Sequence, residues 1–145
     1  MRRGQLSLDL LFAVTLIAIT MLNVIYTANE QIAYTQTLDT TARLKIFSIS
    51  LRDSIVKAYA MGNGYSVRKT LPFSLNAGDS MTIVLNSTAN ILQVNATIDG
   101  VSYYIVQNIT VPLHVTSNIT LTSATTEFWI YANRTGDEVY VTLRT

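Results

Sequence analysis

A run of 19 uncharged residues, from Leu10 to Ala28, stands near the start of the chain. As an α-helix it would rise about 28 Å, close to the roughly 30 Å hydrocarbon core of a bilayer. Arg2 and Arg3 precede the run, and Glu30 follows it. Because basic residues favour the cytoplasmic side, the sequence predicts a membrane-spanning helix with its N-terminus inside and the remaining chain outside.

Two ordinary kinds of N-terminal segment explain this run only in part. A secretory signal peptide has a shorter apolar core and a small-residue cleavage site after it, whereas here Tyr26 occupies one of the small-residue positions. A plain signal anchor explains the apolar run and its orientation. It gives no purpose to Asp9, because a carboxylate held deep in lipid costs up to about 3 kcal/mol.

The residues around Asp9 form a pattern of their own. Arg-Arg-Gly at 2–4 is followed by Gln-Leu-Ser-Leu-Asp at 5–9 and then by the apolar run. This start resembles the class III signal peptide of archaeal type IV pilin-like proteins, whose basic leader ends in Gly and whose mature chain begins Gln-x-Ser-x-Glu. Asp9 stands where that family usually has Glu, and Ala13 stands where Leu is common.

The resemblance implies a cleavage and a set of partners. A prepilin-peptidase-like enzyme would cut between Gly4 and Gln5 and remove the basic leader, residues 1–4. The mature chain would then polymerise with itself, driven by a pilus assembly ATPase on a membrane platform.

The same resemblance gives Asp9 a role in assembly. The new α-amino group on Gln5 of one subunit would be neutralised by Asp9 of a neighbour, because either charge is costly if it is buried without a partner. Gln5, Ser7 and Asp9 are therefore the expected assembly residues. The alternative is that Asp9 lies at the membrane interface and is solvated there.

The helical pattern continues beyond the apolar run. Apolar residues recur at spacings of three and four, and no Pro or Gly occurs between Gln5 and Met61. The sequence predicts one helix over 5–62, with a membrane or filament-core half at 5–28 and a head-docking half at 29–62. Poor helix propensity near 27–41 leaves open two helices with a break there. The expected head-facing residues are Leu44, Phe47, Leu51, Ile55 and Ala58.

From residue 65 to 145 the hydrophobic period becomes two, as in half-buried strands. Asp99-Gly100 is a strong signal for a two-residue hairpin, and the segment 133–137 is a second expected hairpin loop. Seven or eight short strands fit into this region. The predicted fold class is α+β: one long N-terminal helix followed by an antiparallel β-sandwich-like head, with a small barrel as the alternative.

Five Asn-x-Ser/Thr sequons occur in this region, and they predict N-linked glycans on an exported head. Five of the seven asparagines from Asn76 onward are in sequons, which exceeds the one or two matches that we would roughly expect by chance in a Thr-rich sequence. The acceptor candidates are Asn86, Asn95, Asn108, Asn118 and Asn133.

The sequence gives little support for a catalytic role or a metal-binding role. The chain has no cysteine and one histidine, His114, which we expect to be a strand residue. The net charge is +1 and the basic residues are scattered, so no nucleic-acid partner is expected. We expect no enzyme, no metal and no cofactor. An aromatic group is expected to pack in the core and at edges, although a sugar-binding patch is the alternative: Tyr103, Tyr104, Phe128, Trp129, Tyr131 and Tyr140.

The sequence therefore favours a structural subunit of an archaeal extracellular type IV pilus-like filament used in adhesion. It would be inserted in the cell membrane as a precursor and then become part of a filament on the cell surface. The first alternative is a membrane-anchored surface glycoprotein that acts as a binding module. The second is a minor pilin or an archaellum-like subunit; the swimming-filament subunits usually lack the acidic residue, so Asp9 argues against them.

Overall fold

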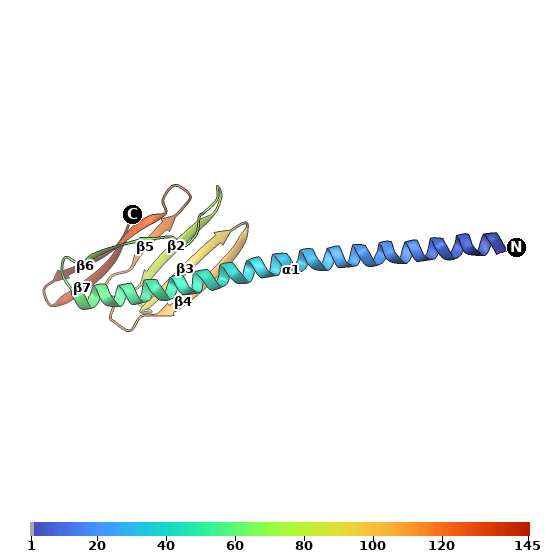
Figure 1. Cartoon of the computed structure of the whole chain (residues 1–145). Helices are drawn as coiled ribbons and strands as arrows, with labels where there is room; N and C mark the ends of the chain where they lie inside the picture. The colour runs from blue at the N-terminus through green and yellow to red at the C-terminus, as the bar shows by residue number, and fades with distance from the viewer. Residues whose placement is uncertain (1) are drawn as a thin grey trace. The chain divides into compact units, whose positions relative to one another are not determined.

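One long helix precedes seven strands in the computed structural model, which describes the backbone of residues 2–145 and the side chains of residues 8–145 (Figure 1). Helix α1 runs over Arg2–Met61. The predicted α+β class, a long N-terminal helix followed by antiparallel sheets, is confirmed. The strands are β1 Ser66–Thr70, β2 Ser80–Asn86, β3 Ile91–Ile98, β4 Val101–Asn108, β5 Ser117–Leu121, β6 Glu127–Thr135 and β7 Glu138–Arg144.

The end of α1 is set by Gly62. This residue adopts a φ of 77°, which is readily accessible to glycine, and its N–H donates to the carbonyl of Ala58 at 3.1 Å. The last helical residue is thus Met61, one position before the predicted end. Residues 27–41 are helical, so the break in the helix that their poor helix propensity allowed does not occur.

Two compact units divide the chain between Thr40 and Thr41. The first unit consists of helix alone, and its described side chains from Leu8 to Asp39 are all exposed. The second unit contains the rest of α1 and all seven strands. Burial of α1 side chains in the head core begins at Leu44, later than the predicted boundary at residue 29.

The head contains two antiparallel sheets, with strand orders β1-β6-β7 and β4-β3-β2-β5. They are joined through one side chain. The Ser117 hydroxyl on β5 accepts a hydrogen bond from the Leu143 N–H on β7 at 3.0 Å and donates to the Leu143 carbonyl at 3.3 Å. Within the described part of the chain, β1 and β7 are the outermost strands of the first sheet, and β4 and β5 are those of the second.

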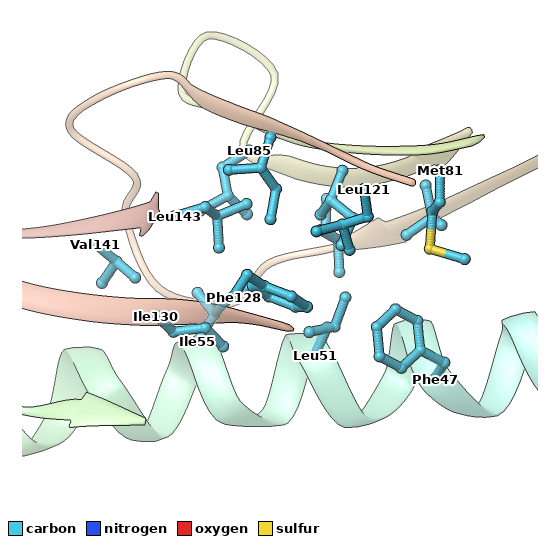
Figure 2. Close-up of a cluster of buried hydrophobic side chains, with 14 of the residues drawn as sticks. Phe47, Leu51, Ile55, Met81, Leu85, Leu121, Phe128, Ile130, Val141 and Leu143 are labelled. Carbon is cyan, nitrogen blue, oxygen red and sulfur yellow. The ribbon is translucent and has the colours of Figure 1, made fainter. Parts of the chain in front are cut away.

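One hydrophobic core is shared by the last part of α1 and both sheets (Figure 2). The predicted helix residues Leu44, Phe47, Leu51, Ile55 and Ala58 are all buried. Phe47 meets Phe128 of β6 edge to face, with ring centroids 6.5 Å apart. Alternate residues of the strands complete the core, as the period of two predicts; they include Met81, Ile83 and Leu85 on β2 and Ile130, Val141 and Leu143 on β6 and β7.

Two hairpins have two-residue turns. Asp99 and Gly100 join β3 to β4 with φ of 50° and 76°, the left-handed values that a type I′ turn requires, which confirms the predicted hairpin. The second hairpin was predicted with a loop over 133–137, and that extent is wrong. Strand β6 pairs with β7 through Thr135 opposite Glu138, so only Gly136 and Asp137 form the turn.

Two polar side chains hold loops of the head together. Asn90 donates from Nδ2 to the carbonyls of Ile109 and Val111, at 2.7 and 3.0 Å, and accepts from the Leu113 N–H at 2.8 Å. The buried carboxylate of Asp79 accepts from the N–H groups of Asn76 and Asp99, both at 2.9 Å. These bonds satisfy backbone groups that no ladder reaches.

Leu51 and Ile46 offer a matched test of this core, since both lie on α1 but Leu51 is fully buried and Ile46 is 68% exposed. We expect Leu51→Ala to lower the free energy of unfolding of the head by about 2–5 kcal/mol, because it leaves a cavity. Ile46→Ala should change it by no more than about 0.5 kcal/mol. Denaturant unfolding of the full chain in detergent, followed by Trp129 fluorescence, measures both; equal effects would contradict this packing.

Candidate functional site

The surface of α1 from Leu8 to Tyr26 is apolar on all sides. Thirteen large hydrophobic side chains in this stretch are each more than half exposed. A surface of this kind is unstable in water and needs lipid or protein around it. The helix is long enough and apolar enough to span a membrane. The exposed residues are Leu8, Leu10, Leu11, Phe12, Val14, Leu16, Ile17, Ile19, Met21, Leu22, Val24, Ile25 and Tyr26.

The polar side chains in this stretch bond to the helix itself. The hydroxyls of Thr15, Thr20 and Thr27 donate to the carbonyls four residues earlier, each at 2.8 Å. Asn23 donates from Nδ2 to the Ile19 carbonyl at 3.0 Å. Because the three hydroxyls and one N–H of Asn23 are satisfied within the helix, these donors can enter apolar surroundings without being left unpaired.

Asp9 is the one charged residue between Leu8 and Ala28, and it is exposed on α1. A carboxylate in such a surface needs a cation or water to solvate it. The predicted cleavage residues Gly4 and Gln5 and the assembly residue Ser7 lie outside the residues whose side chains the structure describes.

The five acceptor asparagines lie on strands of the head. Asn95, Asn108, Asn118 and Asn133 are exposed, and Asn86 is half-exposed. In the part of the chain that the structure describes, none of the five donates a hydrogen bond from Nδ2, the atom to which an N-linked glycan is attached. The Nδ2 groups of Asn76 and Asn90, which are outside sequons, do donate. The sequon amides are therefore available for modification.

Four of these asparagines share the outer face of one sheet. Asn86, Asn95, Asn108 and Asn118 come from β2, β3, β4 and β5. The residues that point outward from these four described strands are all uncharged: Ser80, Thr82, Val84, Asn86, Ile91, Gln93, Asn95, Thr97, Ser102, Tyr104, Val106, Asn108, Asn118 and Thr120.

The three-stranded sheet has a different outer face. Arg68 on β1 lies 3.5 Å from Glu127 on β6, and the Arg144 guanidinium lies 5.4 Å from the centre of the Tyr131 ring. Trp129 packs beside Tyr131 with ring centroids 6.1 Å apart. Charged side chains thus gather on this sheet, with Trp129 and Tyr131 beside them, whereas the face with four acceptor asparagines carries no charge.

The aromatic residues that the sequence grouped together are distributed over different surfaces. Phe128 is fully buried, and Tyr103 packs against the core from β4. Tyr104 and Trp129 are exposed, on the outer faces of different sheets. The six residues therefore do not form a single sugar-binding patch.

His114 lies in the loop between β4 and β5, so its expected place on a strand is wrong. Pro112 and the bonds from Asn90 hold this loop out of the sheet. His114 Nδ1 is 3.5 Å from Glu138 Oε2, which accepts a hydrogen bond from the Tyr140 hydroxyl at 2.7 Å. Among the described residues, no group of three or more His, Cys, Asp or Glu side chains is placed to hold a metal ion.

Comparisons with protein-family models, with curated proteins and with solved structures find no match to this chain. The geometry described above gives two candidate functional sites. They are the apolar surface of α1 from Leu8 to Tyr26 and the uncharged outer face of the four-stranded sheet, which carries four acceptor asparagines.

Glu138 should control the titration of Tyr140. The hydrogen bond to Glu138, then burial, then the charge of Glu138 raise the pKa of Tyr140 above its ordinary value of 10.0. The stabilisation linked to this shift is present below the ordinary pKa and is lost as pH rises through the folded-state pKa. We expect Glu138→Gln to lower the pKa of Tyr140, measured by NMR of labelled tyrosine with Tyr140→Phe for assignment. An unchanged pKa would contradict this contact.

The apolar surface of α1 should hold the chain in membranes. Replacing Leu16 and Ile19 together with Lys adds two charges, each costing about 2.5–3.5 kcal/mol near the middle of a membrane-spanning helix. We expect the double variant to move to the soluble fraction or to be degraded, measured by alkaline extraction of membranes. Gln36→Lys, outside the uncharged run, should stay with membranes like the parent chain.

Proposed function

We propose that this chain is the structural subunit of an extracellular type IV pilus-like filament of archaeal type, which polymerises through the N-terminal part of α1. The observation that carries the proposal is the apolar surface of Leu8–Tyr26 in a chain whose head has a complete core of its own. That surface is separate from the folding of the head, so its purpose lies in contacts with lipid or with other chains.

Besides lipid, a bundle of such helices provides apolar surroundings for this surface. A helix can leave the membrane when neighbouring helices replace the lipid around it. The Thr hydroxyls that bond to their own helix carry no unsatisfied donors into that bundle. If each subunit contacts the next through a head-to-tail interface that does not close, the product is an open helical polymer.

The leader and Asp9 fit this proposal through the resemblance of residues 2–9 to a class III signal peptide. Cleavage after Gly4 by a prepilin-peptidase-like enzyme frees the amine of Gln5, and an assembly ATPase with its membrane platform extracts the subunit. Asp9, charged and surrounded by apolar residues, then pairs with the Gln5 amine of a neighbour. The pairing selects the register of the helices, because an unpaired buried charge costs several kcal/mol, roughly 3–5.

The head would lie outside the cell in the membrane precursor and on the outside of the filament. Arg2 and Arg3, which precede the uncharged run of α1, support this orientation. The acceptor asparagines support it too, because their Nδ2 groups are available on exposed strands of the head. Adhesion would then be a property of a glycan-bearing surface.

The N-terminal peptide of protein sheared from the cell surface tests this function. We expect it to begin at Gln5, as a free or cyclised residue, and to be recovered with filaments. A chain that begins at Met1 and is found only in membranes would instead identify a membrane-anchored surface glycoprotein, the main alternative. Recovery at trace level in filaments made mostly of another protein would indicate a minor subunit.

Substitution of Asp9 tests the assembly pairing. We expect Asp9→Asn to be exported and processed but to lose filaments, because the Gln5 amine then lacks its counter-charge. Asp9→Glu keeps the carboxylate and should restore them. Electron microscopy of sheared material, with immunoblots of the membrane precursor, separates assembly from expression. Normal filaments from Asp9→Asn would contradict the pairing and leave Asp9 as an interfacial residue.

A further inference from the structure

One of the two outermost strands of the four-stranded sheet, β4, has an open edge of unusual composition. It is eight residues long, and its sequence VSYYIVQN contains no charged residue and no proline. It pairs with β3 without interruption, from Val101 opposite Ile98 to Asn108 opposite Ile91, so the ladder contains no bulge. Charges, proline and bulges are the features that commonly stop an edge strand from pairing with another chain.

Backbone groups of β4 are free to pair. In a hairpin closed by a two-residue turn, hydrogen-bonded pairs alternate along the ladder from the closing pair, here Ile98 with Val101. The backbone groups of Ser102, Tyr104 and Val106 therefore point away from β3. Nothing in the described part of the chain forms a hydrogen bond with these groups.

The side chains on this edge are apolar as well as exposed. Val101 is 43% exposed, Tyr104 66% and Val106 40%. Trp129 is the remaining exposed large hydrophobic residue in the described strands. An open edge that combines free backbone groups with apolar side chains is a template for strand pairing between chains.

Strand β1, an outermost strand of the three-stranded sheet, is protected by ordinary means. It is five residues long, it carries Arg68 and Lys69, and Pro72 follows it closely. Short length, charge and proline all discourage pairing at an edge. The outermost strands β1 and β4 of the two sheets therefore differ, and β4 needs another kind of cover.

Two sequons stand next to the exposed apolar residues of β4. Asn108 lies on β4 itself, one side-chain repeat beyond Val106, which is about 7 Å along a strand. Asn95 on β3 lies directly opposite Tyr104, and both are exposed on the outer face. A shallow hollow of about 330 Å³ joins Asn95 and Tyr104, with Thr82 and Ser102 among its other lining residues. The acceptor atoms thus flank the apolar part of the edge.

We propose that N-linked glycans on Asn95 and Asn108 cover the open edge of β4 and keep heads from pairing through it. The sugar attached to Asn95 lies against Tyr104 in the hollow, and the sugar on Asn108 screens Val106 and the adjoining backbone. A hydrated oligosaccharide fixed at the edge excludes an incoming strand by its bulk, as a charge or a proline does on β1. This inference rests on the proposed function for one point only, that the head is exported and meets the glycosylation machinery.

The test compares two double variants of the full chain, expressed in an archaeal host that glycosylates and extracted in detergent. Asn95→Gln with Asn108→Gln removes the two sequons at the edge. Asn118→Gln with Asn133→Gln removes the same number elsewhere and is the matched control. Glycopeptide mass spectrometry measures the occupancy of each asparagine, and size-exclusion chromatography with light scattering measures association.

We expect Asn95 and Asn108 to be occupied in the parent chain, and their double variant to lose most of its monomer to larger species. The control variant should elute like the parent. Adding Val106→Lys to the edge variant should restore the monomer, because a charge then protects the strand. This rescue also distinguishes strand pairing from simple misfolding.

Four results would overturn the proposal. Edge cover would be refuted if Asn118 and Asn133 carried glycans and Asn95 and Asn108 did not. Export and the proposed filament would then remain intact. Association of both double variants to the same extent would assign no special role to the edge. Efficient cross-linking of Ser102→Cys between copies of the parent chain, which has no cysteine of its own, would mean that a second copy covers β4. A chain without any glycan would refute edge cover and also remove the support that the acceptor asparagines give to export.

Discussion

The packing of one face of α1, from Leu44 to Ala58, onto both sheets is the contact on which the rest of this structure depends. The inner faces of the strands are continuous rows of apolar side chains, and each sheet alone would leave its row in water. The helix completes the core, with Leu51 and Phe47 set against residues of both sheets (Figure 2). The helix is therefore part of the head as well as the N-terminal segment.

This contact divides α1 into parts with different physical needs. From Leu44 onward its apolar face is buried in the head core, whereas the apolar side chains between Leu8 and Tyr26 are exposed. The second group must be surrounded by lipid or by other helices. A chain built this way can exchange one environment for the other while its head stays folded, which is the physical basis of the proposed filament. In the proposed filament, the carboxylate of Asp9 would make that exchange selective, since it would require a matching positive charge.

The outer surfaces of the head divide in a related way. Charges and their partners, such as Arg68 with Glu127, lie on the three-stranded sheet. The four-stranded sheet presents an uncharged face with four acceptor asparagines. Charge and glycan are two ways to keep a β-sheet surface soluble and its edges unpaired. In a chain with only 13% charged residues, the proposed glycans would take over much of the role that charge has elsewhere.

The sequence by itself determined the features that depend on residues close together in the chain. Helical spacing identified the face from Leu44 to Ala58, alternation identified the strands, and Asp99-Gly100 identified its turn, because each signal reflects local backbone geometry. Only the tertiary structure decided the strand order and the position of His114 in a loop. It also decided that Asn133 belongs to β6, where it pairs with Tyr140 of β7. The edge position of β4 was decided in the same way. These features depend on which distant segments meet, and the local pattern of a strand is the same at an edge as in the middle of a sheet.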